Sequence, residues 1–416
     1  MRSIRVVVTG IGVVSALGAS LESFWDGLCT GRSGINKITR FDSSDLPCRI
    51  AGEIPDFDPK EYMDRTEIRR TPRATHLAVG AAKMALMDAN LGEQVPVPER
   101  SGVMLGTGVG GIENVTGSFE MMKKTGYSRL NPFQLPTGLP NMPAAQIAKE
   151  VHCLGPNNTT TAACAAGTQA VGEGAEYIWR DAADLVLAGG TEAVVSEHVI
   201  GAFSAMRALP TDYNDQPQAA SRPFDRKRQG FVLAEGAAVL VLENLENAVA
   251  RGAKIYAEVI GHSSSSDAYH MIAMDTEGSG PERAMRWAID NAKISPADIE
   301  YINPHGTSTA LNDATETKAI KRVFGDYAYD LPISSTKSMT GHAMGATGAL
   351  EAVACIMVIN SGIIPPTINY EHPDPECDLY YVPNEAIYRQ VDITLSNSFG
   401  LGGQNACLVL KRFNEG

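Results

Sequence analysis

The chain has 416 residues with 35 Lys and Arg against 48 Asp and Glu, so its formal net charge is −13, which disfavours a nucleic-acid binder. With 44% hydrophobic and 20% charged residues, it has the composition of a folded globular protein, and its length predicts two domains or two fused half-domains. Seven cysteines, an odd number without a CxxC pair, argue against a secreted disulfide framework and favour reduced thiols in a cytoplasm.

The first half alternates short β-branched runs with Ala-rich helical stretches, which is the rhythm of an α/β fold. The stretch from Ile4 to Val8 is interrupted by Arg5 and is too short for a signal peptide, so it predicts a first strand that stops at Thr9-Gly10. The other predicted elements are strands at 102–105 and 185–187 and helices at 75–90, 142–150 and 168–180.

The second half repeats this order. Its predicted elements are strands at 256–260, 300–303 and 333–336, helices at 281–292 and 312–324, and a small-residue helix that opens at His342. Each half closes with a predicted hairpin, at 229–243 and at 397–411, with AVLVL in one matching ACLVL in the other. We therefore predict two pseudo-repeated halves, 1–253 and 254–416, that share one core, although any α/β chain yields some such parallels.

The most apolar helical window, at 352–359, has eight residues. A bilayer span needs about 18 to 20. The sequence therefore predicts no membrane span.

Cys164 is the first candidate for chemistry. It follows the strand-like NNTTTAA and precedes a run of small residues that opens a helix, so its sulfur is expected at a helix N-terminus. The helix dipole favours an anion there, which predicts a lowered thiol pKa and a substantial thiolate fraction near neutrality. The alternative is a small buried residue in an Ala/Gly-rich helix.

Two histidines lie at matched positions of the second half. His305 follows an apolar strand in NPHGTST, and His342 opens the small-residue helix, at the place that Cys164 has in the first half. A lone histidine is more often structural, but two of them facing a matched cysteine favour catalysis. Because the sequence has no HxxxH or HExxH spacing, we expect no metal site.

Lys337, five residues before His342, is expected to keep an imidazole neutral through its charge. Glu351, Asp313 or Glu316 are its candidate partners. A solvated loop lysine is the alternative reading.

The glycine-rich stretch GTGVGG at 106–111 formally satisfies GxGxxG after a strand. A dinucleotide site also needs a helix, a second strand and an acidic residue about 20 residues later, whereas a Pro-punctuated segment follows here. We therefore predict a tight turn without a bound dinucleotide, in which Val109 is available to line an apolar pocket. GLGG at 400–403 is similarly expected to be a mobile or backbone-donating loop beside the site.

Four ordered motifs extend over the chain: TAACAAG around Cys164, HGTST at 305–309, STKSMTGH at 335–342 and NSFGLGG at 397–403. Together they resemble the elongating β-ketoacyl-acyl carrier protein synthases, synthase II class, of the thiolase-like fold. The resemblance implies a five-layered αβαβα fold of two duplicated halves, a homodimer, a cytoplasmic location and an acyl carrier protein as partner. It also implies that the enzyme has no cofactor of its own, because phosphopantetheine arrives on the carrier protein.

The activity that the resemblance implies is a decarboxylating Claisen condensation. Cys164 would carry the acyl chain while His305 and His342 polarise the malonyl thioester. The remaining roles implied are Lys337 with Glu351 beside the second histidine, Asp313 and Glu316 in support, Thr307 and Thr309 at phosphopantetheine, Val109 and Phe203 in the acyl pocket, and Phe399, Gly400 and Leu401 at the oxyanion hole and gate.

Several positions depart from the family pattern. The gate position is Leu401 where Phe is usual, and Pro304 stands where Ala is usual. Neither change touches the Cys/His/Lys/His set, so the departures concern acyl-chain length, gating and pathway. The alternatives are a specialised ketosynthase of secondary metabolism, a Cys-His thioester hydrolase, and a silent partner subunit.

Carrier proteins are expected to be acidic, so an acidic enzyme needs a local basic patch to dock one. The segment RTEIRRTPR supplies basic residues for such a patch, although a solvated helix face is the alternative. The candidates are Arg65, Arg69, Arg70 and Arg73, with Arg129 and Arg207 matched from the family.

Overall fold

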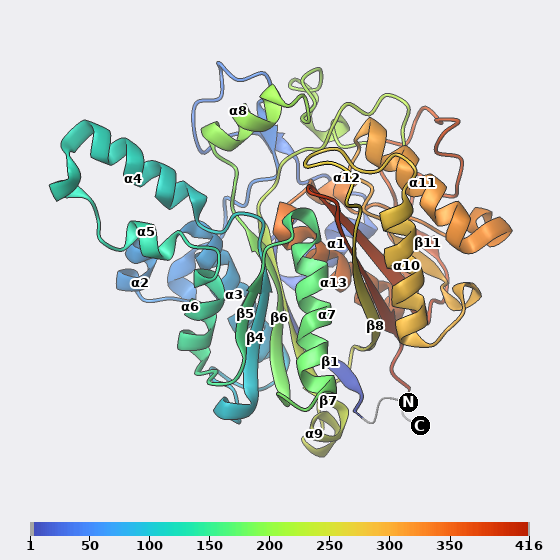
Figure 1. Ribbon diagram of the computed structural model, residues 1–416, viewed down its shortest axis with the longest axis horizontal. Helices are drawn as coiled ribbons and strands as arrows, with labels where there is room; N and C mark the ends of the chain where they lie inside the picture. Colours follow the sequence, from blue (N-terminus) through green and yellow to red (C-terminus); the bar gives the residue numbers. More distant parts are fainter. Residues whose placement is uncertain (1–3, 415–416) are drawn as a thin grey trace.

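A nine-stranded sheet forms the centre of the computed structural model, which describes residues 4–414. Its order is β5-β4-β6-β7-β1-β8-β13-β12-β9 (Figure 1). The strands are β1 (Val6–Val14), β4 (Ser101–Gly106), β5 (Asn157–Thr160), β6 (Leu185–Glu192), β7 (Gly236–Asn244), β8 (Ala257–Ser266), β9 (Tyr301–Asn303), β12 (Ile393–Gly400) and β13 (Gln404–Lys411).

The sheet order shows the duplication directly. β1 and β8 meet at the centre over three residue pairs, and β7 and β13, β6 and β12, then β4 and β9 follow outward on the two sides. The directions match as well, since β6–β7 and β12–β13 are antiparallel while β4–β6 and β9–β12 are parallel. The predicted division at 253/254 falls in the connection between α9 (Leu245–Ala250) and β8.

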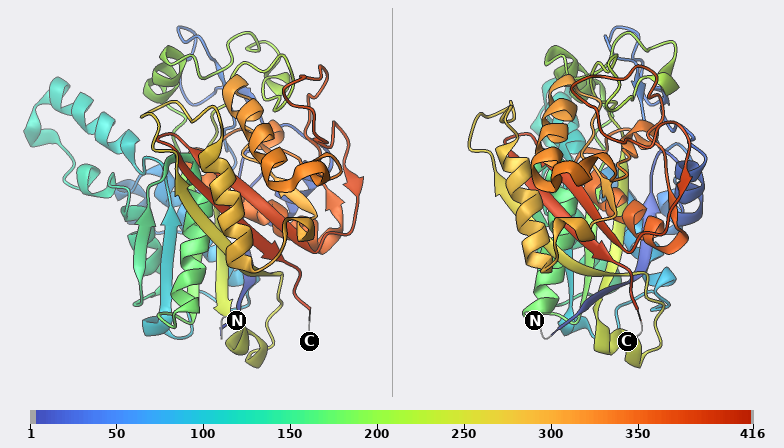
Figure 2. Two further views of the ribbon diagram at one scale, coloured as in Figure 1. Left: turned by 45° about the vertical axis from the view of Figure 1, so that its right-hand side comes forward. Right: turned by 90° about the vertical axis from the view of Figure 1, so that its right-hand side faces the viewer.

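Helices form three layers around the two half-sheets. α7 (Ala166–Trp179) and α13 (Thr347–Ser361) pack against each other and contact strands of both halves. α3 (Arg73–Asp88) covers the outer face of β1, β6 and β7, while α10 (Ser279–Ala292) covers β8 and β13 (Figure 2). This helix–sheet–helix–sheet–helix arrangement confirms the five-layered fold.

The other helices connect these layers or lie at the surface. They are α1 (Leu21–Cys29), α2 (Arg65–Arg70), α4 (Ile112–Thr125), α5 (Gln134–Thr137), α6 (Met142–Val151), α8 (Glu197–Ala205), α11 (Ala310–Phe324) and α12 (Lys337–Thr340). Two-stranded ribbons pair β2 (Asn36–Lys37) with β3 (Ile50–Ala51) and β10 (Ile363–Ile364) with β11 (Ile387–Tyr388).

The first strand is longer than predicted, because its glycines serve packing and not a turn. β1 continues through Gly10 and Gly12 to Val14 with every residue buried. A Cβ at Gly12 would lie 1.9 Å from the Ala81 carbonyl oxygen of α3, and one at Gly10 would lie 2.2 Å from that of Ala85. Glycine therefore lets the backbone of α3 approach the strand.

Two further predictions in the sheet are corrected. The hairpin at 229–243 is wrong: its second arm is β7, but residues 232–234 instead bond to the backbone of His342 and to Gly52. The hairpin at 397–411 is present as β12 and β13. Residues 333–336 contribute one bridge, between Ile333 and Ile302, in place of a strand.

One helical stretch, Met344–Ser361, is apolar and long enough to span a membrane by length and composition. It is longer than the eight-residue window seen in the sequence. In the fold, 83% of it is buried, since α13 occupies the central layer. Its apolar character is explained by the core that both halves share.

Candidate active site

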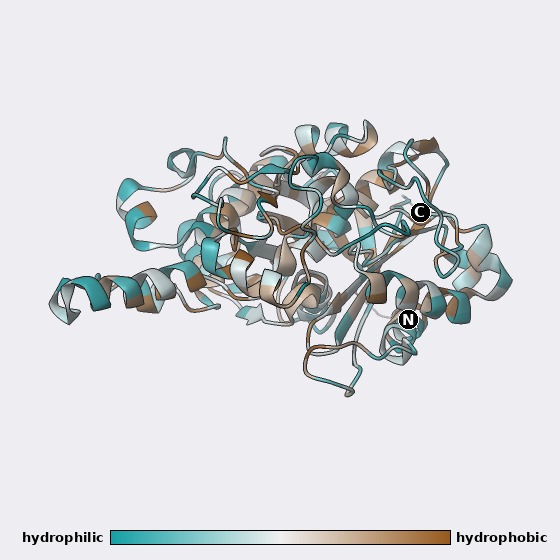
Figure 3. Cartoon of the chain, turned by 90° about the horizontal axis from the view of Figure 1, so that it is seen from above, coloured by the Kyte–Doolittle hydropathy of each residue, from teal (hydrophilic) through white to brown (hydrophobic). Residues whose placement is uncertain are grey.

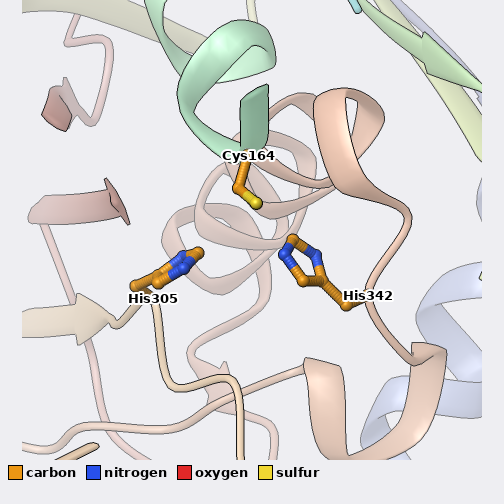
Figure 4. A group of neighbouring side chains, drawn as sticks. All are labelled: Cys164, His305 and His342. Carbon is orange, nitrogen blue, oxygen red and sulfur yellow. The ribbon is translucent and has the colours of Figure 1, made fainter. Parts of the chain in front are cut away.

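A cavity of about 490 Å³ opens where the ends of the strands meet the starts of α7 and α13. Its wall holds Cys164, His305 and His342, which point toward one another (Figure 4). The donor atoms of the three side chains, Sγ and one ring nitrogen from each histidine, all lie within 4.8 Å of one another. The structure thus brings together three residues that are far apart in the sequence.

Cys164 sits in a one-turn 3-10 helix, η4 (Ala163–Ala165), which leads directly into α7. Ala163 takes φ +47°, a conformation in which L-residues are strained, and this turn presents the cysteine at the helix start. The backbone N–H groups of Leu401 and of Cys164 itself act on the sulfur and lower the pKa of the thiol. These two amides form a ready anion site around the thiol.

The thiol is nevertheless protonated at neutral pH, which corrects the lowered pKa predicted from the helix terminus. Burial raises its pKa to about 11, and the charge of Glu192 raises it further, against the lowering effects of the two amides and of Lys337. Desolvation therefore outweighs the lowering effects of the amides and of Lys337.

Both histidines are held as neutral imidazoles. Burial and the charge of Lys337 lower their pKa well below the ordinary value, and in His305 the second histidine adds to the effect. Nδ1 of His342 lies 2.9 Å from the Thr347 hydroxyl. Its Nε2, like Nδ1 of His305, has no hydrogen-bond partner among the described residues. Nε2 of His342 is therefore free to meet a ligand.

Lys337 is fully buried and pairs with Glu351, so the partner offered first by the sequence is the one found. Burial raises the pKa of Glu351 to about 7, although Lys337 lowers it. The other two candidate partners of Lys337, Glu316 and Asp313, make different contacts. Glu316 accepts the backbone N–H groups of His305 (2.7 Å) and Gly306 (2.8 Å) and so fixes that turn. Asp313 lies 3.6 Å from Arg228 and accepts the N–H of Phe224.

The predicted substrate-binding residues divide between the cavity and its surroundings. Thr307 and Thr309 line it, with their hydroxyls 2.9 Å apart, as do Phe203 and Leu401. Phe399 and Gly400 also line it. Val109 lies outside this lining and is 39% exposed.

The predicted docking arginines do not gather at the cavity mouth. Arg207 lines the cavity, whereas Arg69 and Arg70 lie on α2, where Arg70 stacks on Phe133 at 4.5 Å. Arg129 lies beyond the end of α4. Arg73 is wrong as a docking residue, because it pairs with the buried Glu235 at 2.7 Å. Arg65 opens α2 at the surface.

The register of the duplication also differs from the prediction. The 3-10 turn η8 (Met344–Ala346) precedes α13 as η4 precedes α7, and Met344 takes φ +45°, as Ala163 takes +47°. The residue equivalent to Cys164 is therefore Gly345, and His342 lies three residues earlier. The sequence misled here because both helices begin with similar small residues.

Sequence reasoning missed Glu192, the last residue of β6, which is buried beside the site and whose charge acts on Cys164. A single glutamate after the apolar LVLAGGT gives no sequence signal of its own. It also missed α4, because that helix exposes part of its apolar side. The residues after α4 form a 3-10 turn and α5.

Cys164, His305 and His342 are also the one group of three such side chains, within residues 4–414, that lie close enough to hold a metal ion. Their sequence spacing hid this proximity. The expectation that the protein works without a metal stays a prediction.

Comparisons with known proteins agree on one family. Two family models, the N-terminal and C-terminal domains of beta-ketoacyl synthase, match residues 3–248 and 256–371. The chain is 46% identical to a 3-oxoacyl-[acyl-carrier-protein] synthase 2 of Synechocystis sp. over 98% of both chains. It is 44% identical to one of Staphylococcus aureus over 99% of both.

Solved structures give the same picture. The ishigamide ketosynthase/chain length factor superposes with a TM-score of 0.93 and 38% identity, over 99% of this chain and 100% of the other. A ketosynthase solved in complex with its type II polyketide acyl-carrier protein superposes with a TM-score of 0.89 and 35% identity, over the same shares.

Proposed function

The chain belongs to the beta-ketoacyl synthase family, and from that premise we propose that Cys164, His305 and His342 carry out its condensation of an acyl chain with malonyl-acyl carrier protein. The enzyme is an acyltransferase of the 3-oxoacyl-[acyl-carrier-protein] synthase kind, which forms a carbon–carbon bond in chain elongation. What supports the residue roles most is the convergence of the thiol and two neutral imidazoles within 4.8 Å on one cavity wall.

The first step loads the acyl chain onto Cys164. With a pKa of about 11, only about one thiol in ten thousand is ionised at pH 7. A neighbouring neutral imidazole therefore accepts the thiol proton as Sγ attacks the thioester carbonyl. The oxyanion lies at the N–H groups of Cys164 and Leu401. When the old carbon–sulfur bond breaks, the imidazole returns the proton to the departing phosphopantetheine thiolate.

The second step releases CO2 from the malonyl thioester. Its carbonyl oxygen accepts hydrogen bonds from His305 and His342. The bond from C2 to the carboxylate breaks, and its electron pair stays on the thioester as an enolate. Neutral imidazoles suit this role because the N–H donors stabilise the enolate oxygen without protonating the carbon.

In the third step C2 attacks the acyl carbonyl carbon held on Cys164. The oxyanion again lies at the N–H groups of Cys164 and Leu401. The carbon–sulfur bond breaks, and the Cys164 thiolate takes up a proton from solvent. The β-ketoacyl chain leaves on the carrier protein, and one proton has been consumed for each CO2 released.

The experiment incubates the enzyme with acyl- and malonyl-carrier protein and follows the β-ketoacyl product and CO2 by mass spectrometry. We expect product from the native chain and none from Cys164→Ala. Hydrolysis of the acyl thioester without malonyl consumption would instead indicate a Cys-His hydrolase. Inertness of the native chain would indicate a silent subunit.

A specialised ketosynthase is the second candidate. Leu401 stands at the gate where the family usually has Phe, and two similar solved structures are ketosynthases of ishigamide and of a type II polyketide. The acyl-chain profile in the same experiment separates this from primary fatty acid synthesis.

The carrier-borne substrate would enter along polar residues at the cavity mouth. Thr307 and Thr309 offer adjacent hydroxyls for phosphopantetheine, and Phe203 would contact the acyl chain. No cofactor is required by this scheme, because phosphopantetheine arrives on the carrier protein. Arg69, Arg70, Arg129 and Arg207 are the proposed contacts to that acidic protein.

We also propose a homodimer in the cytoplasm. β5 is an edge strand with residues 157 and 158 exposed, which leaves backbone groups available for a second copy. α4 and the turn after it extend from the body of the molecule (Figure 3). This segment carries exposed apolar residues, among them Phe119, Met121 and Tyr127. Sedimentation of the purified chain tests this, and a monomer at micromolar concentration would contradict it.

A further inference from the structure

Glu192 is a fully buried carboxylate that the mechanism above does not use. No Lys or Arg lies within ion-pair distance of it among residues 4–414. A buried charge without a cation is costly unless hydrogen bonds satisfy it. Its surroundings therefore need an explanation.

Four uncharged donors from two separate segments surround this carboxylate. Gly108 N–H donates at 2.6 Å, Val109 N–H at 3.3 Å and the Thr107 hydroxyl at 3.1 Å, all from the loop after β4. The fourth, Gly345 N–H at 3.0 Å, comes from the turn before α13. Glu192 therefore ties a loop of the first half to a turn of the second.

The junction has no room for a side chain at these glycines. A Cβ at Gly345 would lie 2.3 Å from the Gly108 nitrogen, and one at Gly108 would lie 2.7 Å from a Glu192 carboxylate oxygen. Gly108, Gly345 and the Glu192 carboxylate are in direct van der Waals contact. A change in the size of the carboxylate side chain must therefore displace the loop, the turn or both.

Comparison of the two duplicated halves shows which site the Glu192 carboxylate occupies. Gly345 is the equivalent of Cys164, and β6 and β12 are equivalent strands that end at Glu192 and Gly400. In one copy the turn holds the thiol beside the N–H of Leu401, just after β12. In the other copy the turn's N–H donates to Glu192, at the end of β6. The second half therefore has its own anion site at this turn, and the protein's own Glu192 carboxylate occupies it.

We propose that Glu192 is a positioning residue that fills the second half's counterpart of the oxyanion hole and thereby fixes the loop that carries Val109 and the turn that carries Met344. Val109 is held through its own N–H, and Met344, which lines the cavity, precedes Gly345. Because Met344 lines the cavity, its position should also affect which acyl chains are accepted. This consequence rests on the proposed function.

Glu192 also acts on the nucleophile through its charge. The charged or titratable groups that act on the thiol are Glu192, which raises the pKa of Cys164, and Lys337, which lowers it. His305 and His342 face the thiol in neutral form. Removing the charge of Glu192 should therefore lower the Cys164 pKa.

The test compares three variants of the full chain. Glu192→Gln removes the charge, and Glu192→Asp keeps the charge but shortens the reach. Glu243→Gln is the matched control, since Glu243 is a buried carboxylate at the far end of the same sheet, paired with Arg251. All three are checked for folding by thermal unfolding.

The first readout, alkylation of Cys164 by iodoacetamide between pH 6 and 9, needs no condensation. Burial raises the pKa of Glu192 itself to about 7, so its charge is present mainly above that pH. There we expect Glu192→Gln to react about threefold faster, which corresponds to about half a unit of thiol pKa, whereas below about pH 7 the two profiles should converge. Glu192→Asp and Glu243→Gln should follow the native profile.

The second readout is the ratio of kcat/KM for long and short acyl chains. Both Glu192 variants should change this ratio by about fivefold, and Glu243→Gln should not. A native alkylation profile and a native ratio in a folded Glu192→Gln would overturn the proposal and leave Glu192 a merely structural residue. If the native chain condenses nothing, the proposed function fails, and the alkylation profile still decides whether Glu192 acts on the nucleophile.

Discussion

Burial and one buried lysine together set the charge state of the site. Lys337 lies in the core with Glu351 and lowers the pKa of His305, His342 and Cys164. In the proposed mechanism the histidines donate N–H groups while staying neutral, so this ammonium would maintain the catalytic form at low pH. The acid limit of activity should therefore report on Lys337.

Replacing this lysine should move that limit upward. A histidine whose pKa is lowered stays neutral until the pH falls through that lowered value. In Lys337→Met the histidine pKa rises, so condensation should be lost about one pH unit higher than in the native enzyme. The measurement is kcat/KM for condensation between pH 4.5 and 8.

A single change at this pair would leave Glu351 buried without its cation, so the variant is best made with Glu351→Leu as well. Replacing both members by apolar residues of similar size is often neutral for stability, whereas removal of one costs about 3 to 5 kcal/mol. An unchanged acid limit in the folded double variant would contradict the electrostatic role of Lys337.

Leu401 joins two functions in one residue. Its backbone N–H lowers the pKa of the Cys164 thiol, and the residue lines the cavity. Leu401→Phe retains the N–H and enlarges the side chain. We expect the ratio of long to short β-ketoacyl products to change by about fivefold with little loss of total rate. The measurement is a mixed-substrate competition read by mass spectrometry, and Leu401→Met, which conserves the volume of the side chain, is the control. An unchanged product ratio in Leu401→Phe would count against a gate at this position.

Residues in dense motifs could be predicted from the sequence, and isolated ones could not. Cys164, His305, His342 and Lys337 each lie in a distinctive run of letters. The roles of Glu192, Asp313 and Glu316 could not be predicted, because they depend on which backbone N–H groups donate to each carboxylate in the folded chain. The raised pKa of Cys164 was missed because the helix terminus is visible in the sequence, whereas the depth of burial is not.

At the scale of elements, the close approach of α3 to β1 makes a stability prediction. Gly12→Ala would place a Cβ 1.9 Å from the Ala81 carbonyl oxygen, which forces the helix and strand apart. We expect a loss of about 2 kcal/mol or more in the free energy of unfolding, measured by urea titration. Gly117→Ala is the matched control, because Gly117 lies in α4 with nothing within 4 Å of an added Cβ. That change should be neutral or stabilise by up to about 1 kcal/mol, and an equal loss in both variants would contradict the packing argument.

Helices and strands with regular patterns were found from the sequence, often within two residues. Predicted ends failed where glycines pack against a neighbouring backbone, as in β1 and at Gly189 and Gly190 of β6. The segment 229–235 has the short apolar run of a strand, but it bonds to His342 and Gly52, which lie far away in sequence. Local pattern cannot report such long-range pairing.

For the whole molecule, duplication explains why one active site serves two similar halves. Each half supplies a strained turn before a central helix, and each turn faces a strand end of the other half. One turn carries the thiol and leaves its anion site open for substrate. The other carries Gly345 and has its site closed by Glu192. Cys164 comes from the first half and both histidines come from the second, so the proposed mechanism requires both halves to fold onto one another.

The proposed partner is an acidic carrier protein, and with a net charge of −13 this chain would need local basic residues for that protein to approach. Arg207 is exposed and lines the cavity mouth, and Arg69 is exposed on α2. Charge reversal at either position should raise KM for carrier-bound substrate about threefold to tenfold, because it weakens steering and docking, with kcat little changed. Adding salt should raise the native KM toward that of the variants.

The controls for this prediction separate docking from folding and chemistry. A small acyl thioester without the carrier protein should be used equally well by the native enzyme, Arg69→Glu and Arg207→Glu. Lys293→Glu reverses an exposed charge at the C-terminal end of α10 and should leave both substrates unaffected. If Arg207→Glu impairs the small thioester as much as the carrier-bound one, Arg207 serves the cavity itself and not the carrier. If Arg69→Glu behaves like Lys293→Glu, the landing site is confined to the cavity mouth and α2 takes no part in docking.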